Sequence, residues 1–162
     1  MKKLFFLLAI VIFCLLQIAI FDYFKIFGVK PDFLLICTVG ACIYFNPRWS
    51  LAFGIFAGIL KDSFGTNAYG LNTILFTLWT WFAIKISQKI TLDNYLVRAV
   101  FIFLIVILND IIIKFIFFLS GNFVPLRLFL KVTFIESLYT ALASLWAFKA
   151  CERLVYFKSS RY

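Results

Sequence analysis

The sequence predicts an all-α integral membrane protein, a single polytopic domain over residues 1–162 with about six transmembrane helices. Composition is the first reason: 65% of the residues are hydrophobic and 14% are charged, whereas soluble domains average about 45–50% apolar and about 25% charged residues. The apolar residues also gather in long runs, and the longest polar stretch between runs, Lys85 to Arg98, has no room for a soluble catalytic domain. The excess apolar side chains therefore face lipid.

The first two apolar runs have clear boundaries. The run from Leu4 to Phe21 follows two lysines and is longer than the apolar region of a signal peptide, which has about 7–15 residues. It ends in bulky residues instead of a small-residue cleavage site, so we expect a retained span. The second run, Phe33 to Phe45, is preceded by Pro31 and Asp32 and followed by Asn46, Pro47 and Arg48. Proline just inside a helix start and proline after its end are both boundary signals.

Runs three and four are Trp49 to Leu60 and Leu71 to Ile84, and a glycine-rich turn separates them. Runs two and three are shorter than the about 20 residues that cross a hydrocarbon core of about 30 Å. They are either short spans or a hairpin that enters the membrane and returns. Both alternatives leave the chain on the same side at Ser63, so the overall topology is the same.

The fifth run is Ala99 to Leu119 and the sixth is Val132 to Phe148, followed by a basic cytoplasmic tail, residues 149–162. With six spans, ten of the 16 basic residues fall on the side of both termini, five fall on the other side, and Lys114 lies within a run. The positive-inside rule then predicts that both termini are cytoplasmic. Because these charges are scattered between apolar runs and form no stripe, we expect no nucleic-acid partner.

The sequence lacks the residues that several kinds of functional site require. It has no histidine, the commonest general base and metal ligand. The four cysteines form no C-x-x-C pair, so neither a zinc site nor a disulfide framework is indicated. We expect no cofactor and no metal. An enzyme is the least supported class, because no nucleophile with a positioned base is visible.

A small-residue step marks the third run. Gly54 and Gly58 form a G-x-x-x-G pattern with Ala57 beside it and Ala52 a turn earlier. Such a face lets helix backbones approach closely in a membrane. It is expected to pack within the molecule, although the same face could receive a partner protein's span.

One turn further on, Asp62 lies on the same helical face and precedes a link that ends in Gly70, Leu71 and Asn72. A carboxylate here could bind an ion, or it could cap the next helix, whose first amides have no intrahelical acceptor. The capping role, together with Asn72, is the favoured alternative. Trp79, Trp81 and Trp146 fall at the cytoplasmic ends of their runs, where an aromatic belt is expected.

The fifth run carries an intramembrane polar cluster, Asn109, Asp110 and Lys114. Charges at this depth cost about 2.5–3.5 kcal/mol each on insertion scales, so they should face the bundle and find partners. Asp110 and Lys114 are four residues apart and can neutralise each other, and Glu136 of the sixth run is a further candidate partner for Lys114. A structural network or partner-docking site is favoured over a transport pathway.

The chain resembles the MreD family, the bacterial rod shape-determining membrane proteins. The resemblance begins at Lys30-Pro31-Asp32-Phe33-Leu34 and Asn46-Pro47-Arg48. It continues through Gly54, Gly58, Asp62, Gly65, Gly70, Leu71 and Asn72. The layout of several spans without large loops is also similar. From the family pattern we carry over Pro31, Asp32, Gly54, Gly58, Asp62, Gly65, Gly70 and Asn72 as motif and packing residues.

The resemblance implies a non-enzymatic scaffold in the bacterial inner membrane that takes part in cell elongation and peptidoglycan synthesis. Its implied partner is MreC, with MreB, the RodA glycosyltransferase and a penicillin-binding transpeptidase in the wider complex; a homodimer stays open. The implied six-helix fold is similar to the substrate-binding subunits of energy-coupling-factor vitamin transporters. That similarity supplies the alternative function, a vitamin-binding transporter subunit in which Asp62, Asn72 and Asp110 contact the ligand.

Overall fold

The computed structural model describes residues 2–19, 29–64, 70–89, 94–121 and 125–159, and these residues are helical apart from short connections. The six helices are α1 (Lys2–Ala19), α2 (Phe33–Tyr44), α3 (Pro47–Phe64), α4 (Leu71–Ser87), α5 (Tyr95–Leu119) and α6 (Leu126–Ser159). The all-helical class is therefore confirmed, with one helix for each apolar run. α6 continues through most of the segment in which the sequence predicted a basic tail.

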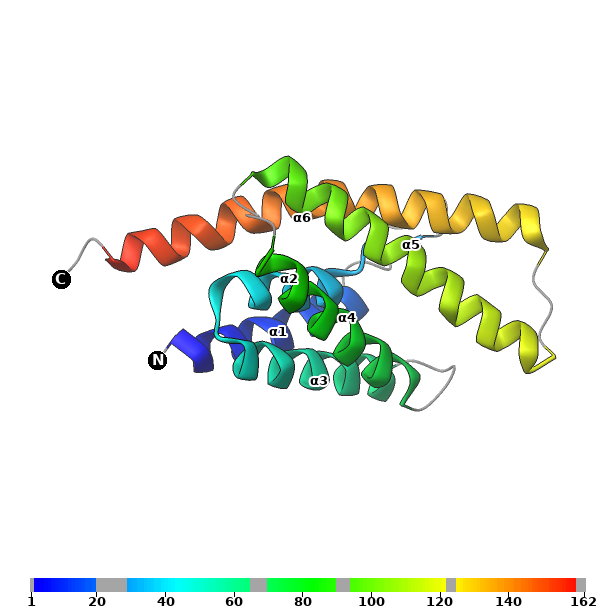
Figure 1. The fold of residues 1–162 in the computed structure, drawn as a ribbon, viewed down its shortest axis with the longest axis horizontal. Helices are drawn as coiled ribbons and strands as arrows, with labels where there is room; N and C mark the ends of the chain where they lie inside the picture. Colours follow the sequence, from blue (N-terminus) through cyan, green and yellow to red (C-terminus); the bar gives the residue numbers. More distant parts are fainter. Residues whose placement is uncertain (1, 20–28, 65–69, 90–93, 122–124, 160–162) are drawn as a thin grey trace.

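Among the described residues, two helices, Tyr95–Leu119 and Arg127–Lys149 within α6, are long and apolar enough to cross a membrane. Phe6–Leu15 and Phe33–Tyr44 are shorter apolar helices. The long pair, α5 and α6, lies side by side across one edge of the molecule (Figure 1). α3 and α4 form a second closely packed pair. The two chain ends, the turn between α2 and α3, the end of α4 and the start of α5 all lie toward one end of the molecule (Figure 1).

The shortest of these helices, α2, is the central one. It has 12 residues and contacts each of the other five helices. Its residues are apolar or small on every side, which is typical of a helix that is buried all round. At 1.5 Å per residue it is about 18 Å long, too short to cross a membrane alone. Surrounding helices and the buried residues Pro31 and Asp32 before it therefore complete its environment.

The core joins α2 to residues from every other helix. Leu35, Val39, Phe76 and Ile102 are 1% exposed or less. Phe148 of α6 packs so close to α2 that a methyl group on Gly40 would lie 3.3 Å from its ring. Near the α2–α3 turn, three phenylalanine rings pack against one another, with ring centroids 4.9–5.2 Å apart, the usual range for aromatic pairs. These rings are Phe6, Phe45 and Phe53.

The boundary signal of α2 is confirmed at its end, but at its start Pro31 lies outside the helix and not just inside it. Asp32 is its N-cap, and its carboxylate accepts a hydrogen bond from Leu35 N at 3.1 Å. At the other end, the Ser50 hydroxyl donates to the carbonyl of Ala41 at 2.9 Å. Pro47 does more than end α2, because it is also the first residue of α3, where its missing N–H costs nothing.

Candidate functional site

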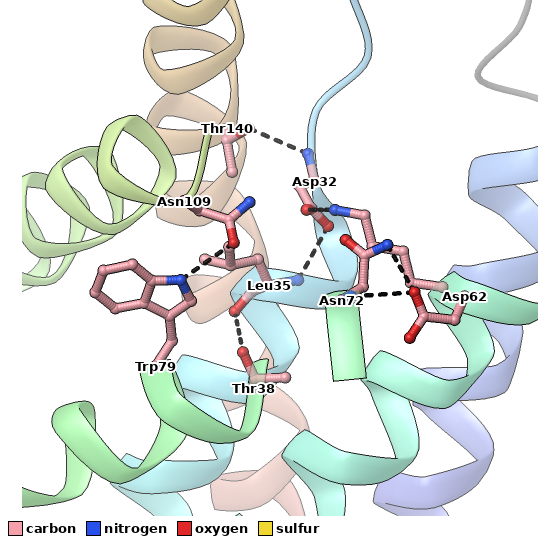
Figure 2. A network of polar contacts seen from close by, with 9 residues as sticks. Asp32, Leu35, Thr38, Asp62, Asn72, Trp79, Asn109 and Thr140 are labelled. Atoms are coloured by element: carbon pink, nitrogen blue, oxygen red, sulfur yellow. Dashed lines mark hydrogen bonds and ion pairs between the residues drawn. The ribbon is translucent and has the colours of Figure 1, made fainter. Parts of the chain in front are cut away.

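Four of the sequence-predicted site residues, Asp32, Asp62, Asn72 and Asn109, take part in polar contacts in the interior, where polar groups from five helices gather near the start of α2 (Figure 2). Asp32 lies at the centre of this network. The Asp32 backbone N–H donates to the Thr140 hydroxyl of α6 at 3.1 Å, and its carboxylate pairs with the Lys61 ammonium of α3. Since Asp32 is 3% exposed, these contacts supply the partners that a buried charge and a non-helical backbone need.

Asp62 caps the start of α4. Its carboxylate accepts hydrogen bonds from Asn72 N at 3.1 Å and Asn72 Nδ2 at 2.9 Å. It also accepts from Thr73 N at 2.8 Å and the Thr73 hydroxyl at 2.6 Å. These are the capping contacts expected between Asp62 and Asn72, and they also satisfy free amides at a helix N-terminus. Gly70 precedes α4 with φ +89°, a left-handed conformation that glycine adopts without strain. Gly65 lies outside the described residues.

Gly54 and Gly58 face α4, not a partner protein. A methyl group on Gly58 would lie 2.5 Å from Thr73 Cα, which is backbone, and one on Gly54 would overlap the Thr80 side chain. Ala57 is fully buried beside them, but Ala52 is exposed and does not belong to this face. The expectation of internal packing is correct. The alternative, that a partner's span binds this face, is wrong because α4 fills it.

The predicted cluster on α5 divides between two environments. Asn109 is 2% exposed, and its Oδ1 accepts a hydrogen bond from Trp79 Nε1 at 3.1 Å, which ties α5 to α4 (Figure 2). Trp79 itself is 5% exposed, so it belongs to the core and not to an aromatic belt. Trp81 and Trp146 are 52% and 80% exposed, consistent with a surface position.

The charged members of the cluster are Asp110, Lys114 and Glu136, and all three are half-buried. The pairing of Asp110 with Lys114, and that of Glu136 with Lys114, stay predictions.

Three contributors to this network, Lys61, Trp79 and Thr140, were not recognised from the sequence. Lys61 had a detectable signal, since a lysine at the end of an apolar run needs a partner or a route to water. Trp79 and Thr140 had none, because their partners are 30 and 108 residues away. At the other end of α2, Arg98 closes the polar stretch between runs four and five, yet it is 6% exposed. It donates to the Tyr44 hydroxyl at 3.4 Å and lies 5.5 Å from the centre of the Phe148 ring.

The polar contacts described above cap helix starts and join neighbouring helices. Within the described residues, no group of three or more Cys, Asp or Glu side chains could hold a metal ion. Asp62 has both oxygens engaged by α4, and Asn109 and Asp32 are engaged by Trp79, Leu35, Lys61 and Thr140.

Comparison with known proteins agrees with the motif residues. No curated protein and no solved structure matches the chain. The family model for the rod shape-determining protein MreD matches residues 1–153, nearly the whole sequence. The family consists of multi-pass, non-enzymatic membrane proteins associated with the machinery that determines rod shape. This chain, with its six helices and its Gly54-Gly58-Asp62-Asn72 packing of α3 on α4, belongs to the MreD family.

Proposed function

We propose that this protein is a non-enzymatic scaffold of the cell-elongation complex in the bacterial inner membrane, and that it binds an MreC-type membrane protein. MreB, RodA and a penicillin-binding transpeptidase belong to the wider complex. The family match over residues 1–153 carries the proposal, since family membership means a role in rod shape determination. The interior supports a scaffold role, because the polar side chains described above are hydrogen-bonded or paired with one another and so hold the helices together.

Partner spans have to use outward-facing residues. Helix association in lipid depends on close packing and interhelical hydrogen bonds, but the small-residue face of α3 is already filled by α4. Large apolar side chains are exposed along α1, α3, α4, α5 and α6, and these outward faces offer the remaining surface. Examples at helical spacing on α5 are Leu104, Leu108, Ile111, Phe115 and Phe118.

The proposed topology has six membrane crossings and both termini in the cytoplasm. Support comes from the arrangement of connections, since both chain ends, the α2–α3 turn and the facing ends of α4 and α5 lie at one end of the molecule. That end carries the segments richest in Lys and Arg, which remain on the cytoplasmic side. α2 then crosses only part of the membrane as a helix, with its start enclosed by protein.

Depletion and copurification test the proposal together. In a rod-shaped host that depends on this gene, depletion should give round cells, and the tagged protein should copurify with the MreC-type partner from crosslinked membranes. Photoreactive residues at exposed Leu108 and Leu119 are suitable crosslinking sites, whereas the fully buried Phe76, already a large aromatic residue, is the negative control. Normal cell shape after depletion, or absence of the partner from the purified material, would contradict the scaffold.

The alternative, a vitamin-binding transporter subunit, finds no specific support. It required Asp62 and Asn72 to contact a ligand, but the Asp62 carboxylate accepts four hydrogen bonds from the start of α4. A vitamin found tightly bound by native mass spectrometry would reverse this ranking.

A further inference from the structure

Exposed residues follow the outer side of the α3–α4 pair in two stripes. On α3 they recur every three or four residues, at Arg48, Ala52, Ile55 and Ile59. α4 repeats this spacing with Ile74, Leu78, Trp81 and Lys85. Residues three or four apart share one face of a helix. Because α3 and α4 pack on each other and on α2, both stripes lie on the side of the pair away from α2.

Each stripe ends in a cation at the same end of the pair. The two helices are antiparallel, as the contacts of both α3 glycines with α4 show, and Gly54 lies against Thr80. Arg48 is six residues from Gly54 and Lys85 is five residues from Thr80, both toward the same end. At 1.5 Å per residue, their α-carbons lie about 9 Å and about 7.5 Å beyond that contact. The two cations are therefore at nearly the same level on neighbouring helices.

No acidic residue accompanies these cations on the two helices at this end. Residues 46–58 and 71–89 contain Arg48, Lys85 and Lys89 but no Asp or Glu, and all three basic side chains are exposed. The Lys85 ammonium lies 5.9 Å from the centre of the Trp81 ring, within the range of a cation–π interaction. Exposed tryptophan next to lysine is typical of the level of lipid headgroups.

We propose that the outer side of the α3–α4 pair binds an anionic phospholipid, with its phosphate at Arg48 and Lys85 and its acyl chains along the apolar part of the two stripes. Arginine and lysine are the side chains that bind phosphate, and basic residues at a membrane surface attract anionic headgroups. A stripe that is apolar along its length and cationic at one end fits an amphiphile. Free phosphate or an acidic protein would use the cations alone.

Lipid titration of the delipidated protein in detergent, followed by native mass spectrometry, tests this site. Phosphatidylglycerol should bind about 25-fold more tightly than phosphatidylcholine with the same acyl chains, because each of the two cations contributes about fivefold. Arg48→Gln and Lys85→Gln should each lower the phosphatidylglycerol affinity about fivefold and leave the phosphatidylcholine affinity unchanged. In phosphatidylcholine the Tm of both variants should equal that of the original protein, since both substitutions are at exposed positions.

The matched control is Arg127→Gln, which removes an exposed arginine at the opposite end of the molecule (Figure 1) and should keep the original lipid affinity. An equal loss in Arg127→Gln would overturn the site, because net charge alone would then attract the lipid. Equal affinity for the two lipids would also overturn it. Displacement of phosphatidylglycerol by an equal concentration of inorganic phosphate would assign the cations to a free anion. Unchanged lipid affinity in the Arg48→Gln, Lys85→Gln double variant would leave them to an acidic protein, and either result refutes the proposal.

Discussion

At the scale of single residues, two acidic side chains act on helix starts. Asp32 caps α2 and Asp62 caps α4. Helix N-termini carry free amides and a partial positive charge, so a carboxylate there is stabilised even away from water. This explains why both residues are located just before or between apolar runs. Their role is to begin helices at defined depths.

Asp62→Ala should lower the free energy of unfolding by about 1–2 kcal/mol, because two α4 amides lose their acceptor. Asp62→Asn retains an oxygen acceptor and should lose less. Thermal or SDS titration of the detergent-solubilised protein measures both. The neighbouring Ser63→Ala is the matched control, since the exposed Ser63 hydroxyl bonds only within its own helix. Equal stability of Asp62→Ala and Ser63→Ala would mean that the cap contributes nothing.

At the scale of elements, contacts between helices depend on what lies opposite a small residue. Gly54 faces the side chain of Thr80, but Gly58 faces the backbone at Thr73. A side chain can change rotamer or be shortened, whereas a helix backbone has to move as a unit. The two glycines of one G-x-x-x-G step are therefore not equivalent.

Gly58→Ala should destabilise the protein by about 1–3 kcal/mol, the usual cost of overpacking. Gly54→Ala should also destabilise it, but adding Thr80→Ala should recover part of the loss, while no side-chain change on α4 should rescue Gly58→Ala. Unfolding of the purified variants is the measurement. Ala52→Leu, at an exposed position of the same helix, should be neutral. A neutral Gly58→Ala would refute the close contact.

The hydrogen bond between Trp79 and Asn109 supports a second prediction at this scale. Asn109→Leu leaves the buried indole N–H without an acceptor, which should cost about 1–3 kcal/mol of unfolding free energy. Adding Trp79→Phe removes the orphaned donor and should restore part of the stability. Trp81→Phe, at an exposed tryptophan two residues away, should change little. If the double variant is no more stable than Asn109→Leu, the bond between α4 and α5 is not the cause.

At the scale of the whole molecule, the central short helix explains how a chain of 162 residues forms a membrane domain. α2 is enclosed by the other helices, so its polar start and end are satisfied by protein, through Thr140 and Lys61 at one end and Ser50 at the other. Non-helical backbone is tolerated in a membrane only under such enclosure. The outer helices in turn expose large apolar side chains, as the composition requires.

The proposed sidedness can be checked with single cysteines at exposed positions in a cysteine-free background. Ser120→Cys should react with a membrane-impermeant maleimide in intact spheroplasts, whereas Asn46→Cys and Gln88→Cys should react only after lysis. The reason is that more basic residues lie on the side of Asn46 and Gln88. The opposite labelling pattern would invert the topology without altering the fold.

The sequence by itself determined the helical membrane class, the approximate ends of each helix and the Asp62–Asn72 cap, because these depend on hydrophobic run length and on residues close along the chain. Only the tertiary structure decided that Lys61 pairs with Asp32, that Trp79 binds Asn109, and that α4 fills the small-residue face. The two pairs are 29 and 30 residues apart, and the small-residue face and α4 lie on opposed helices. No local periodicity specifies them, since helix packing in lipid is set by shape and polar pairing across the whole bundle.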